Sequence, residues 1–322
     1  MAGSGDHIKA LVRSHASGDD ASFYAVATQI AAQAARRGHT RLASELKQTI
    51  DASQSEPLTR RATPIARPKG ELADLLTASF PDVGIRDLIG PPDLLDHVRE
   101  VITEQRQRSL LTQKGFMPIH RLLLEGPPGT GKTLTAQVLA HELSLPLLTI
   151  RLDSLMSKFL GETASKLRLL FDAASEQRAV YLFDEFDALG GNRAGNDVGE
   201  ARRILNSFLV FLEQASPQSI IVAATNHRAI LDPALFRRFD IVIPYRLPDA
   251  TTAAAVMRAR LGPLGKGIRW SSVTKHAEGL SHSDLVKAAE TAAKQAVMRH
   301  ETLITAADLS AALDARAAAS VG

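Results

Sequence analysis

Residues 126–133, GPPGTGKT, place three glycines, a lysine and a threonine at a spacing that suits the phosphates of a nucleotide. Gly126, Gly129 and Gly131 allow backbone conformations that a Cβ would block, so successive N–H groups can point at a polyphosphate. Lys132 would bring a mobile positive charge to the terminal phosphates, and Thr133 would offer a hydroxyl to Mg²⁺ at a helix start. The apolar run before the octet and the helical pattern after it provide the strand–loop–helix context that this motif requires. A glycine- and proline-rich surface turn is the alternative interpretation.

A second group of chemistry-bearing residues lies in AVYLFDEFDAL, residues 179–189. Val180 to Phe183 predict a buried strand, and ligands of open α/β sheets gather at the carboxyl ends of such strands. There, Asp184 would hold Mg²⁺ directly or through its water, and Glu185 would orient and deprotonate the water that attacks the γ-phosphate. We expect this strand to neighbour the one that leads into the glycine-rich octet. A pair of acids at a solvated strand end is the alternative without catalysis.

Three further polar residues follow the next apolar runs. Asn226 ends IIVAATN, where its amide can hydrogen-bond an attacking water or the γ-phosphate, or else cap the next turn. Arg237 and Arg238 are adjacent in LDPALFRRFD, far in sequence from the octet. Guanidiniums supplied by a neighbouring subunit stabilise the charge of phosphoryl transfer, and a solvated basic surface is the alternative.

Composition sets few limits. The 322 residues allow two or three domains, and 38 Lys and Arg against 35 Asp and Glu argue against a protein that coats nucleic acid. The absence of cysteine excludes disulfides and thiolate metal sites. Neither an apolar leader nor a stretch long enough for a membrane span is visible, so we expect a soluble, cytoplasmic protein.

The elements that must position these residues fall into four zones. Residues 1–53 have helical periodicity, with segments near 7–14, 20–37 and 40–52 and a stop at Gly38, and predict a small helical N-terminal domain. Residues 54–79 are taken as a linker, because 54–70 are rich in Pro, Ser, Thr and Arg. Residues 80–248 alternate strand-like and helical runs, the pattern of a parallel sheet wrapped by helices. Residues 249–322 predict helices only.

The motifs, taken in this order, resemble the AAA branch of the AAA+ ATPases. The resemblance covers residues 85–322 and rests on five segments, the octet, the DE strand end, the ATN strand end, LDPALFRRFD and GLSHSDL. It implies an α/β fold, a P-loop NTPase αβα sandwich with a parallel sheet followed by a small all-α lid. It also implies a homo-oligomer, a hexamer, with ATP and Mg²⁺ at the subunit interfaces.

The resemblance implies a role for each matching residue. The catalytic set is Glu185, Asn226, Arg237 and Arg238, and the metal set is Thr133 and Asp184. The residues implied to contact ATP are Ile89, Gly90, Pro128, Gly129, Thr130, Gly131, Lys132, Thr133, Leu134, Asp184, His282 and Ser283.

The chain departs from the family pattern at two places. The two arginines are contiguous, whereas the family usually separates them by Pro-Gly, so which one reaches the neighbouring γ-phosphate is open. GLSHSDL carries His282 and Ser283 where small residues are usual. His282 would pack on the adenine base, or it is an ordinary histidine at a helix start.

The segment SKFLGE, residues 157–162, bears on what the hydrolysis drives. The resemblance implies that an aromatic–aliphatic–glycine triplet at this place, here Phe159, Leu160 and Gly161, lines a central pore and grips an extended polypeptide. Apolar contacts of this kind tolerate varied sequences. The alternative is that Phe159 is a core residue. Residues 191–203 would form a second, glycine-rich pore loop.

Three functions remain open from the sequence. The first is a motor that unfolds or remodels a protein substrate, with the N-terminal helices docking the substrate or a partner. The second is an ATP-gated oligomeric switch that acts on a partner protein without threading. The third, a nucleic-acid motor, lacks a basic stripe or an aromatic module. The chain is also similar, more distantly, to bacterial AAA proteins paired with a subtilisin-like protease, although it contains no protease motif of its own.

Overall fold

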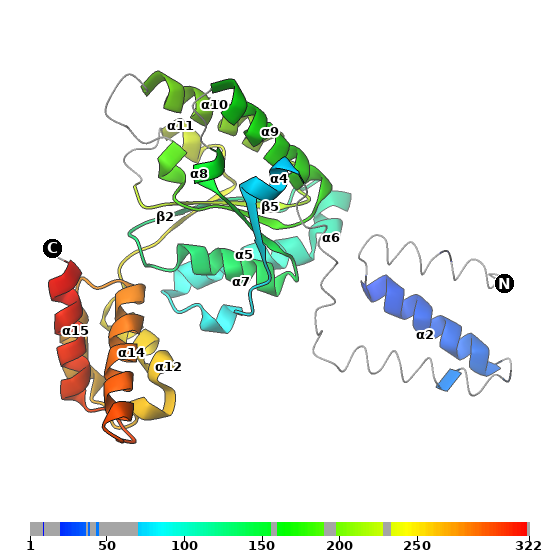
Figure 1. Ribbon diagram of the computed structural model, residues 1–322. Helices are drawn as coiled ribbons and strands as arrows, with labels where there is room; N and C mark the ends of the chain where they lie inside the picture. Colours follow the sequence, from blue (N-terminus) through cyan, green and yellow to red (C-terminus); the bar gives the residue numbers. More distant parts are fainter. Residues whose placement is uncertain are drawn as a thin grey trace. The chain divides into compact units, whose positions relative to one another are not determined.

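The computed structural model describes residues 9, 20–36, 38, 43–44, 70–155, 160–189, 198–227 and 233–320 (Figure 1). The chain divides into two compact units, Met1–Pro64 and Ile65–Gly322.

The first unit contains α2, Asp20–Arg36, which agrees with the helix predicted from residue 20. Gly38 follows it with φ 83° and donates its N–H to Ala35 O at 3.1 Å. This backbone conformation favours glycine and ends the helix as predicted. The other two expected segments, 7–14 and 40–52, lie for the most part outside the described residues.

The second unit is built on a six-stranded sheet in the order β1-β3-β4-β5-β2-β6. The five strands predicted from apolar runs are all present and parallel, but β1 pairs antiparallel with β3 at the edge. The sheet is therefore mixed, not purely parallel. The strand bounds are β1 Leu76–Ser79, β2 Arg121–Glu125, β3 Leu147–Ile150, β4 Val180–Phe183, β5 Ile220–Thr225 and β6 Ile241–Pro244.

The edge strand corrects one predicted boundary. Residues 71–79, expected to end the linker, form the short helix α4, Glu71–Leu75, and then β1. Leu75 and Leu76 are buried in the core of the sheet, and Arg151 N donates to Leu75 O at 2.9 Å. The segment LTAS is too short and too mixed in character for its burial to be read from a local pattern.

Alternate residues of the strands face two separate apolar cores, as the twofold period of a strand requires. In β2, Leu123 joins one core while Leu122 and Leu124 join the other. The helices α9 and α10 pack on the first face, and α5 and α7 pack on the second (Figure 1). Because both faces are covered, the central strands are apolar throughout instead of alternating with polar residues.

Most helices of the second unit connect these strands or cover the sheet. Their bounds are η1 Ile85–Asp87, α5 Pro92–Arg106, α6 Arg108–Gln113, α7 Lys132–Glu142, α8 Leu152–Leu155, α9 Leu160–Glu176, η2 Phe186–Leu189, α10 Val198–Gln214 and α11 Pro233–Phe236.

The last 73 positions of the described chain, 248–320, are helical and have their own apolar core. The helices are α12 Ala250–Leu261, η4 Gly262–Gly265, α13 Trp270–Val273, η5 Thr274–Ala277, α14 His282–Met298 and α15 Ala306–Ser320. Asp249 caps α12, and Ser281 with Asp284 forms a capping box on α14. No helix among the described residues has both the length and the apolar character needed to cross a bilayer.

Candidate nucleotide site

The glycine-rich octet forms a loop between β2 and α7 at the carboxyl end of the sheet. Gly126, Gly129 and Gly131 all have positive φ angles, 146°, 73° and 104°. Gly131 is the N-cap of α7, so the helix begins at Lys132. This arrangement directs the positive end of the helix and its free N–H groups toward the loop, as an anion site requires.

Two of these glycines are required by close packing as well as by conformation. A Cβ on Gly126 would lie 2.2 Å from the backbone oxygen of Tyr245. A Cβ on Gly129 would lie 2.6 Å from Ser281 Oγ and 3.0 Å from Ser283 Cβ. Gly129 is therefore the point where the loop touches the C-terminal helices.

Lys132 is held inside the loop. Its ammonium donates hydrogen bonds to Gly126 O at 2.7 Å and to Pro127 O at 2.8 Å, and the residue is only 6% exposed. Burial lowers the pKa of this lysine, while the charges of Asp184 and Asp187 oppose the change. The ammonium therefore lies among the backbone groups that would surround a phosphate, beside two carboxylates.

The hydroxyl of Thr133 and the carboxylate of Asp184 meet directly. Thr133 Oγ1 donates to Asp184 Oδ2 at 2.7 Å, and Asp184 Oδ1 accepts the backbone N–H of Glu185 at 3.0 Å. A hydroxyl and a carboxylate side by side are oxygen ligands of the kind that Mg²⁺ prefers. Among the described residues no group of three or more His, Cys, Asp or Glu could hold a metal. A Mg²⁺ bound here would therefore take its remaining ligands from phosphate and water.

Glu185 has an unusual backbone conformation. Its φ is 52°, in the left-handed region that residues other than glycine seldom adopt. The next residue, Phe186, is fully buried against Phe208 with ring centroids 4.7 Å apart, whereas the Glu185 side chain is exposed. The turn thus sends the carboxylate out of the sheet edge while Phe186 anchors it, and such strain is typical of functional sites.

The strand that ends in Asp184 does not neighbour the strand before the loop, contrary to the sequence-based expectation. β5 lies between β2 and β4 and pairs in parallel with both. Asn226, which directly follows β5, is therefore placed between the loop and the acidic pair. Strand order depends on long-range packing, so the distance along the chain between two motifs does not report it.

Asp187 is a site residue to which sequence reasoning assigned no role. Its Oδ1 accepts from Thr225 Oγ1 at 3.0 Å and from the Asn226 N–H at 3.2 Å. The carboxylate ties the turn after β4 to the end of β5 and thereby fixes the position of Asn226. A third acid in DEFDAL was the available signal, but its partner on another strand is visible only in the fold.

The two arginines lie at the opposite end of the sheet from the loop of their own chain. They precede β6, which runs parallel to β2, and Asp240 N donates to Arg121 O at the start of β2. About five residues of strand, roughly 16 Å, separate Arg121 from Gly126 at 3.3 Å per residue. The fold therefore does not bring Arg237 or Arg238 to this chain's own loop.

The two arginines also differ from each other. Arg238 forms an ion pair with Glu213 on α10. Arg237 is exposed, and across the described ranges its guanidinium forms no ion pair or hydrogen bond. The structure thus distinguishes a tethered arginine from one that projects into solvent.

Asp240 fixes the segment that carries both arginines. Its carboxylate accepts the backbone N–H groups of His120 at 3.0 Å and Arg121 at 2.9 Å, and it forms an ion pair with the Arg121 side chain. Burial opposes ionisation, yet the hydrogen bonds from His120 and Arg121 hold the pKa of Asp240 well below its usual range. The start of β6 is therefore locked to the start of β2.

The C-terminal helices contact the glycine-rich loop through residues of α14. Ser283 N donates to Gly129 O at 3.0 Å, and Ile89 packs against the apolar core of these helices. Both ring nitrogens of His282 are buried, and among the described residues they have no hydrogen-bond partner. Burial lowers the pKa of His282, and the nearby backbone of Ile89 opposes the change. An imidazole next to this loop whose buried ring nitrogens find no partner in the described chain fits contact with a base that offers its own polar atoms.

The predicted pore residues lie largely outside the described part of the chain. Phe159 is not described, and Leu160 begins α9 without a described side chain. Residues 191–197 of the expected second loop are likewise outside it, whereas residues 198–203, expected in the same loop, begin the helix α10.

Comparison with known proteins identifies relatives over most of the chain. Residues 122–247 match the family described as ATPase family associated with various cellular activities (AAA). The chain is 31% identical over 314 residues to a protein called Uncharacterized AAA family ATPase y4kL from Sinorhizobium fredii, covering 96% of this chain and 94% of that protein.

Two other relatives are longer than the region they share with this chain. An ATP-dependent zinc metalloprotease FtsH 3 from Sphaerobacter thermophilus is 33% identical over 254 residues, which are 76% of this chain and 52% of that protein. A proteasome-activating nucleotidase from Pyrococcus horikoshii is 33% identical over 244 residues, which are 73% of this chain and 61% of that protein.

Proposed function

Because the chain belongs to the AAA family of ATPases and is an ATP hydrolase, we propose that copies of it assemble into a hexamer that hydrolyses MgATP at subunit interfaces and remodels a protein substrate. The position of Arg237 is the observation that supports assembly of several copies. It lies at the end of β6 away from the loop of its own chain, so it can serve only the loop of a neighbouring copy.

The residues around the loop fit a nucleotide triphosphate. The positive-φ glycines and the start of α7 present N–H groups to the phosphates, and Lys132 adds a charge from within the loop. Thr133 and Asp184 would hold Mg²⁺, which neutralises charge on the phosphates. His282, Ile89 and Gly90 form the base side of the site in this proposal, since the unpartnered imidazole lies there.

The turn after β4 provides the base for hydrolysis. A carboxylate oxygen of Glu185 accepts the proton of the attacking water, and Asn226 orients that water or the γ-phosphate. Asp187 keeps Asn226 in place through its contacts to the end of β5. Arg237 of the neighbouring copy stabilises the charge that develops on the transferred phosphoryl group.

The names of two relatives bear on the substrate class. A metalloprotease and a proteasome-activating nucleotidase are both proteins whose names connect them with proteolysis. We propose that this chain likewise acts on proteins, with Phe159 and Leu160 in a central pore and the N-terminal helices as a docking part for a substrate or a protease partner. An ATP-gated switch that binds a partner without threading is the second candidate.

Mixing two inactive variants tests the interface model. Arg237→Ala removes the charge that acts on a neighbour, and Glu185→Gln removes the base in its own site. Hybrid interfaces that pair an intact loop with an intact arginine should regain activity, so the mixture should hydrolyse ATP faster than either variant alone. Activity of the unmodified chain that is carried by a monomer and does not change with protein concentration would contradict the model.

A further inference from the structure

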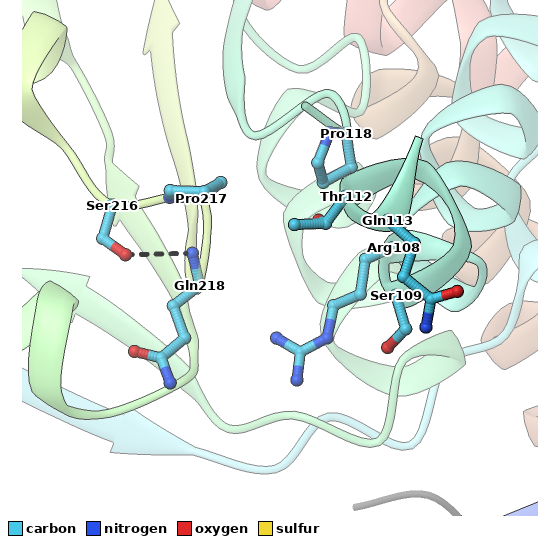
Figure 2. Close-up of a pocket in the computed structure, with 8 residues that line it drawn as sticks. All are labelled: Arg108, Ser109, Thr112, Gln113, Pro118, Ser216, Pro217 and Gln218. Atoms are coloured by element: carbon cyan, nitrogen blue, oxygen red, sulfur yellow. Dashed lines mark hydrogen bonds between the residues drawn. The ribbon is translucent and has the colours of Figure 1, made fainter. Parts of the chain in front are cut away.

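A groove of about 420 Å³ lies at the end of the sheet away from the nucleotide loop (Figure 2). We call it the α6 groove, and its lining residues come from α6, the loop before β2 and the turn before β5. They are Arg108, Ser109, Thr112, Gln113, Pro118, Ser216, Pro217 and Gln218. No acidic residue is among them, and the nucleotide chemistry does not use any of them.

The polar lining of the groove consists of hydroxyl and amide groups, which can donate hydrogen bonds, and one full positive charge. Figure 2 shows the Arg108 guanidinium extending from α6 into the space that faces Gln218. The hydroxyls of Ser109 and Thr112 line the same wall. A guanidinium surrounded by hydroxyls and amides is a setting in which a carboxylate can accept several charge-assisted hydrogen bonds.

A second arginine, Arg178, lies in the chain segment beside the turn that forms the opposite wall. Ser219, next to Gln218, accepts from Ala179 N at 3.2 Å and donates to Gln177 O at 2.8 Å, which holds the backbone on both sides of Arg178 against this turn. Arg178 Nε is buried and has no hydrogen-bond partner within the described part of the chain. Burial and the positive charge of Arg108 lower the pKa of Arg178 to about 10. The guanidiniums of Arg108 and Arg178 repel each other. An anion bound beside them would offset this repulsion.

Large apolar side chains are exposed on the same segment. Leu110 on α6 is 54% exposed, and Phe116 and Met117 in the following loop are 65% and 68% exposed. The loop is held in place, since Phe116 N donates to Leu111 O at 2.9 Å and Ile119 N donates to Glu104 Oε2 at 2.8 Å. These side chains are therefore presented by a fixed backbone on the segment that forms one wall of the groove, and exposed large apolar side chains are a feature of interaction surfaces.

We propose that the α6 groove, with Leu110, Phe116 and Met117, binds an acidic peptide segment that carries apolar side chains and belongs to a partner protein. The positive charge without an acidic counterpart selects the carboxylates, and the apolar residues select the neighbouring side chains. A free phosphate would satisfy the guanidiniums but would leave the three apolar groups in water. The site is separate from the nucleotide loop, so it does not depend on the proposed function.

A labelled peptide can test this with the full chain. The probe is a fluorescein-labelled octapeptide that alternates glutamate with leucine and phenylalanine, and a second probe replaces each glutamate by glutamine. Fluorescence anisotropy should show saturable binding of the acidic probe at low salt, at least about tenfold weaker at high salt because the pairing is ionic. The glutamine probe should bind at least about tenfold more weakly than the acidic one.

Two variants and a matched control connect the binding to the groove. Arg108→Gln should weaken the acidic probe at least about tenfold, and Ser109→Asp should do the same by placing a competing carboxylate at an exposed position. Arg168→Gln, on α9 and paired with Asp172 at 4.0 Å, should leave binding unchanged. All three should keep basal ATP hydrolysis, which shows that they fold.

Three results would overturn the proposal. One is that the acidic probe does not bind the unmodified chain at millimolar concentration. Another is that the glutamine probe binds as well as the acidic probe. The third is that Arg108→Gln disrupts the oligomer in sedimentation while the unmodified oligomer binds no peptide, because the groove would then be an interface between copies of this chain.

Discussion

Thr133 Oγ1 donates a 2.7 Å hydrogen bond to Asp184 Oδ2 across 51 positions of sequence. The two residues follow β2 and β4, which are not neighbours in the sheet. Their contact therefore reaches past the end of β5, where Asn226 and its support Asp187 lie.

Replacing Glu185 with glutamine should separate binding from turnover. The loop, Lys132 and Thr133 stay intact, so nucleotide affinity should persist, whereas loss of the base should lower the hydrolysis rate about 10²- to 10⁴-fold. Phosphate release and titration with a fluorescent ATP analogue measure the two effects. Lys132→Ala is the counterpart that should lose binding. A normal rate in the Glu185→Gln chain would show that another group is the base.

The two arginines should not contribute equally. Arg237→Ala should lower turnover about 10³-fold or more, the range for an arginine supplied in trans. Arg238→Ala should cost less, and Glu213→Gln should reproduce part of that loss, because Glu213 holds Arg238 on α10. ATPase rates of the three variants at equal oligomer concentration give the comparison. If Arg238→Ala were the more damaging change, the assignment of Arg237 as the principal residue would be wrong.

An alanine at Gly129 should disturb the contact between the loop and α14. Its φ is 73° and its Cβ would lie 2.6 Å from Ser281 Oγ, whereas Gly267 has a similar φ of 84° with open space around it. Gly267→Ala therefore reports the cost of the backbone conformation alone, about 1–2 kcal/mol. Gly129→Ala should cost more in thermal unfolding and should weaken ATP binding. Equal effects of the two changes would mean that the contact with Ser281 does not contribute to the free energy of unfolding.

Asp240 should stabilise the fold in a pH-dependent way. Its folded pKa lies below the unfolded value near 4, so its contribution is complete above about pH 4 and is lost as the pH falls further. Asp240→Asn should reduce the free energy of unfolding by roughly 2–3 kcal/mol at pH 7, because charged hydrogen bonds to His120 and Arg121 are lost.

A surface pair provides the control for Asp240. Asp96→Asn removes an exposed ion pair with Arg99 and should cost below about 1 kcal/mol. Denaturant unfolding at pH 7 and at pH 3 should show the difference between Asp240→Asn and the unmodified chain shrinking at the lower pH. A pH-independent difference would contradict the linkage.

Phe159→Ala tests whether Phe159 lines a pore or is buried in the core. It also tests whether the protein threads its substrate or acts as a switch. If Phe159 grips a substrate, basal hydrolysis, assembly and melting temperature should survive while unfolding of a tagged client collapses. If it is buried, the change should cost roughly 3–5 kcal/mol and lower both stability and assembly. A stable, active Phe159→Ala hexamer that processes its client at full rate would favour the switch.

Local chemistry made part of the site predictable from the sequence. The octet 126–133 and the acids at 184 and 185 each lie within one short segment. There, residue type and spacing are enough to indicate phosphate binding and metal binding. The five parallel strands were equally visible, because strands covered on both faces are continuous apolar runs. The helix α2 and its stop at Gly38 follow from periodicity and from the conformational freedom of glycine.

Relations between distant segments were decided only by the tertiary structure. The place of β5 between β2 and β4, the antiparallel β1, and the contact of Asp187 with Asn226 all depend on which strands pair. The same holds for the pairing of Arg238 with Glu213, which distinguishes two identical and adjacent side chains. Strands pair in the order that buries the apolar side chains on both faces of the sheet. Ion pairs form where the packing of helices and strands brings opposite charges together. No local pattern of residues contains that information. The sequence alone therefore indicated the candidate groups of the site, and the fold decided which of them meet.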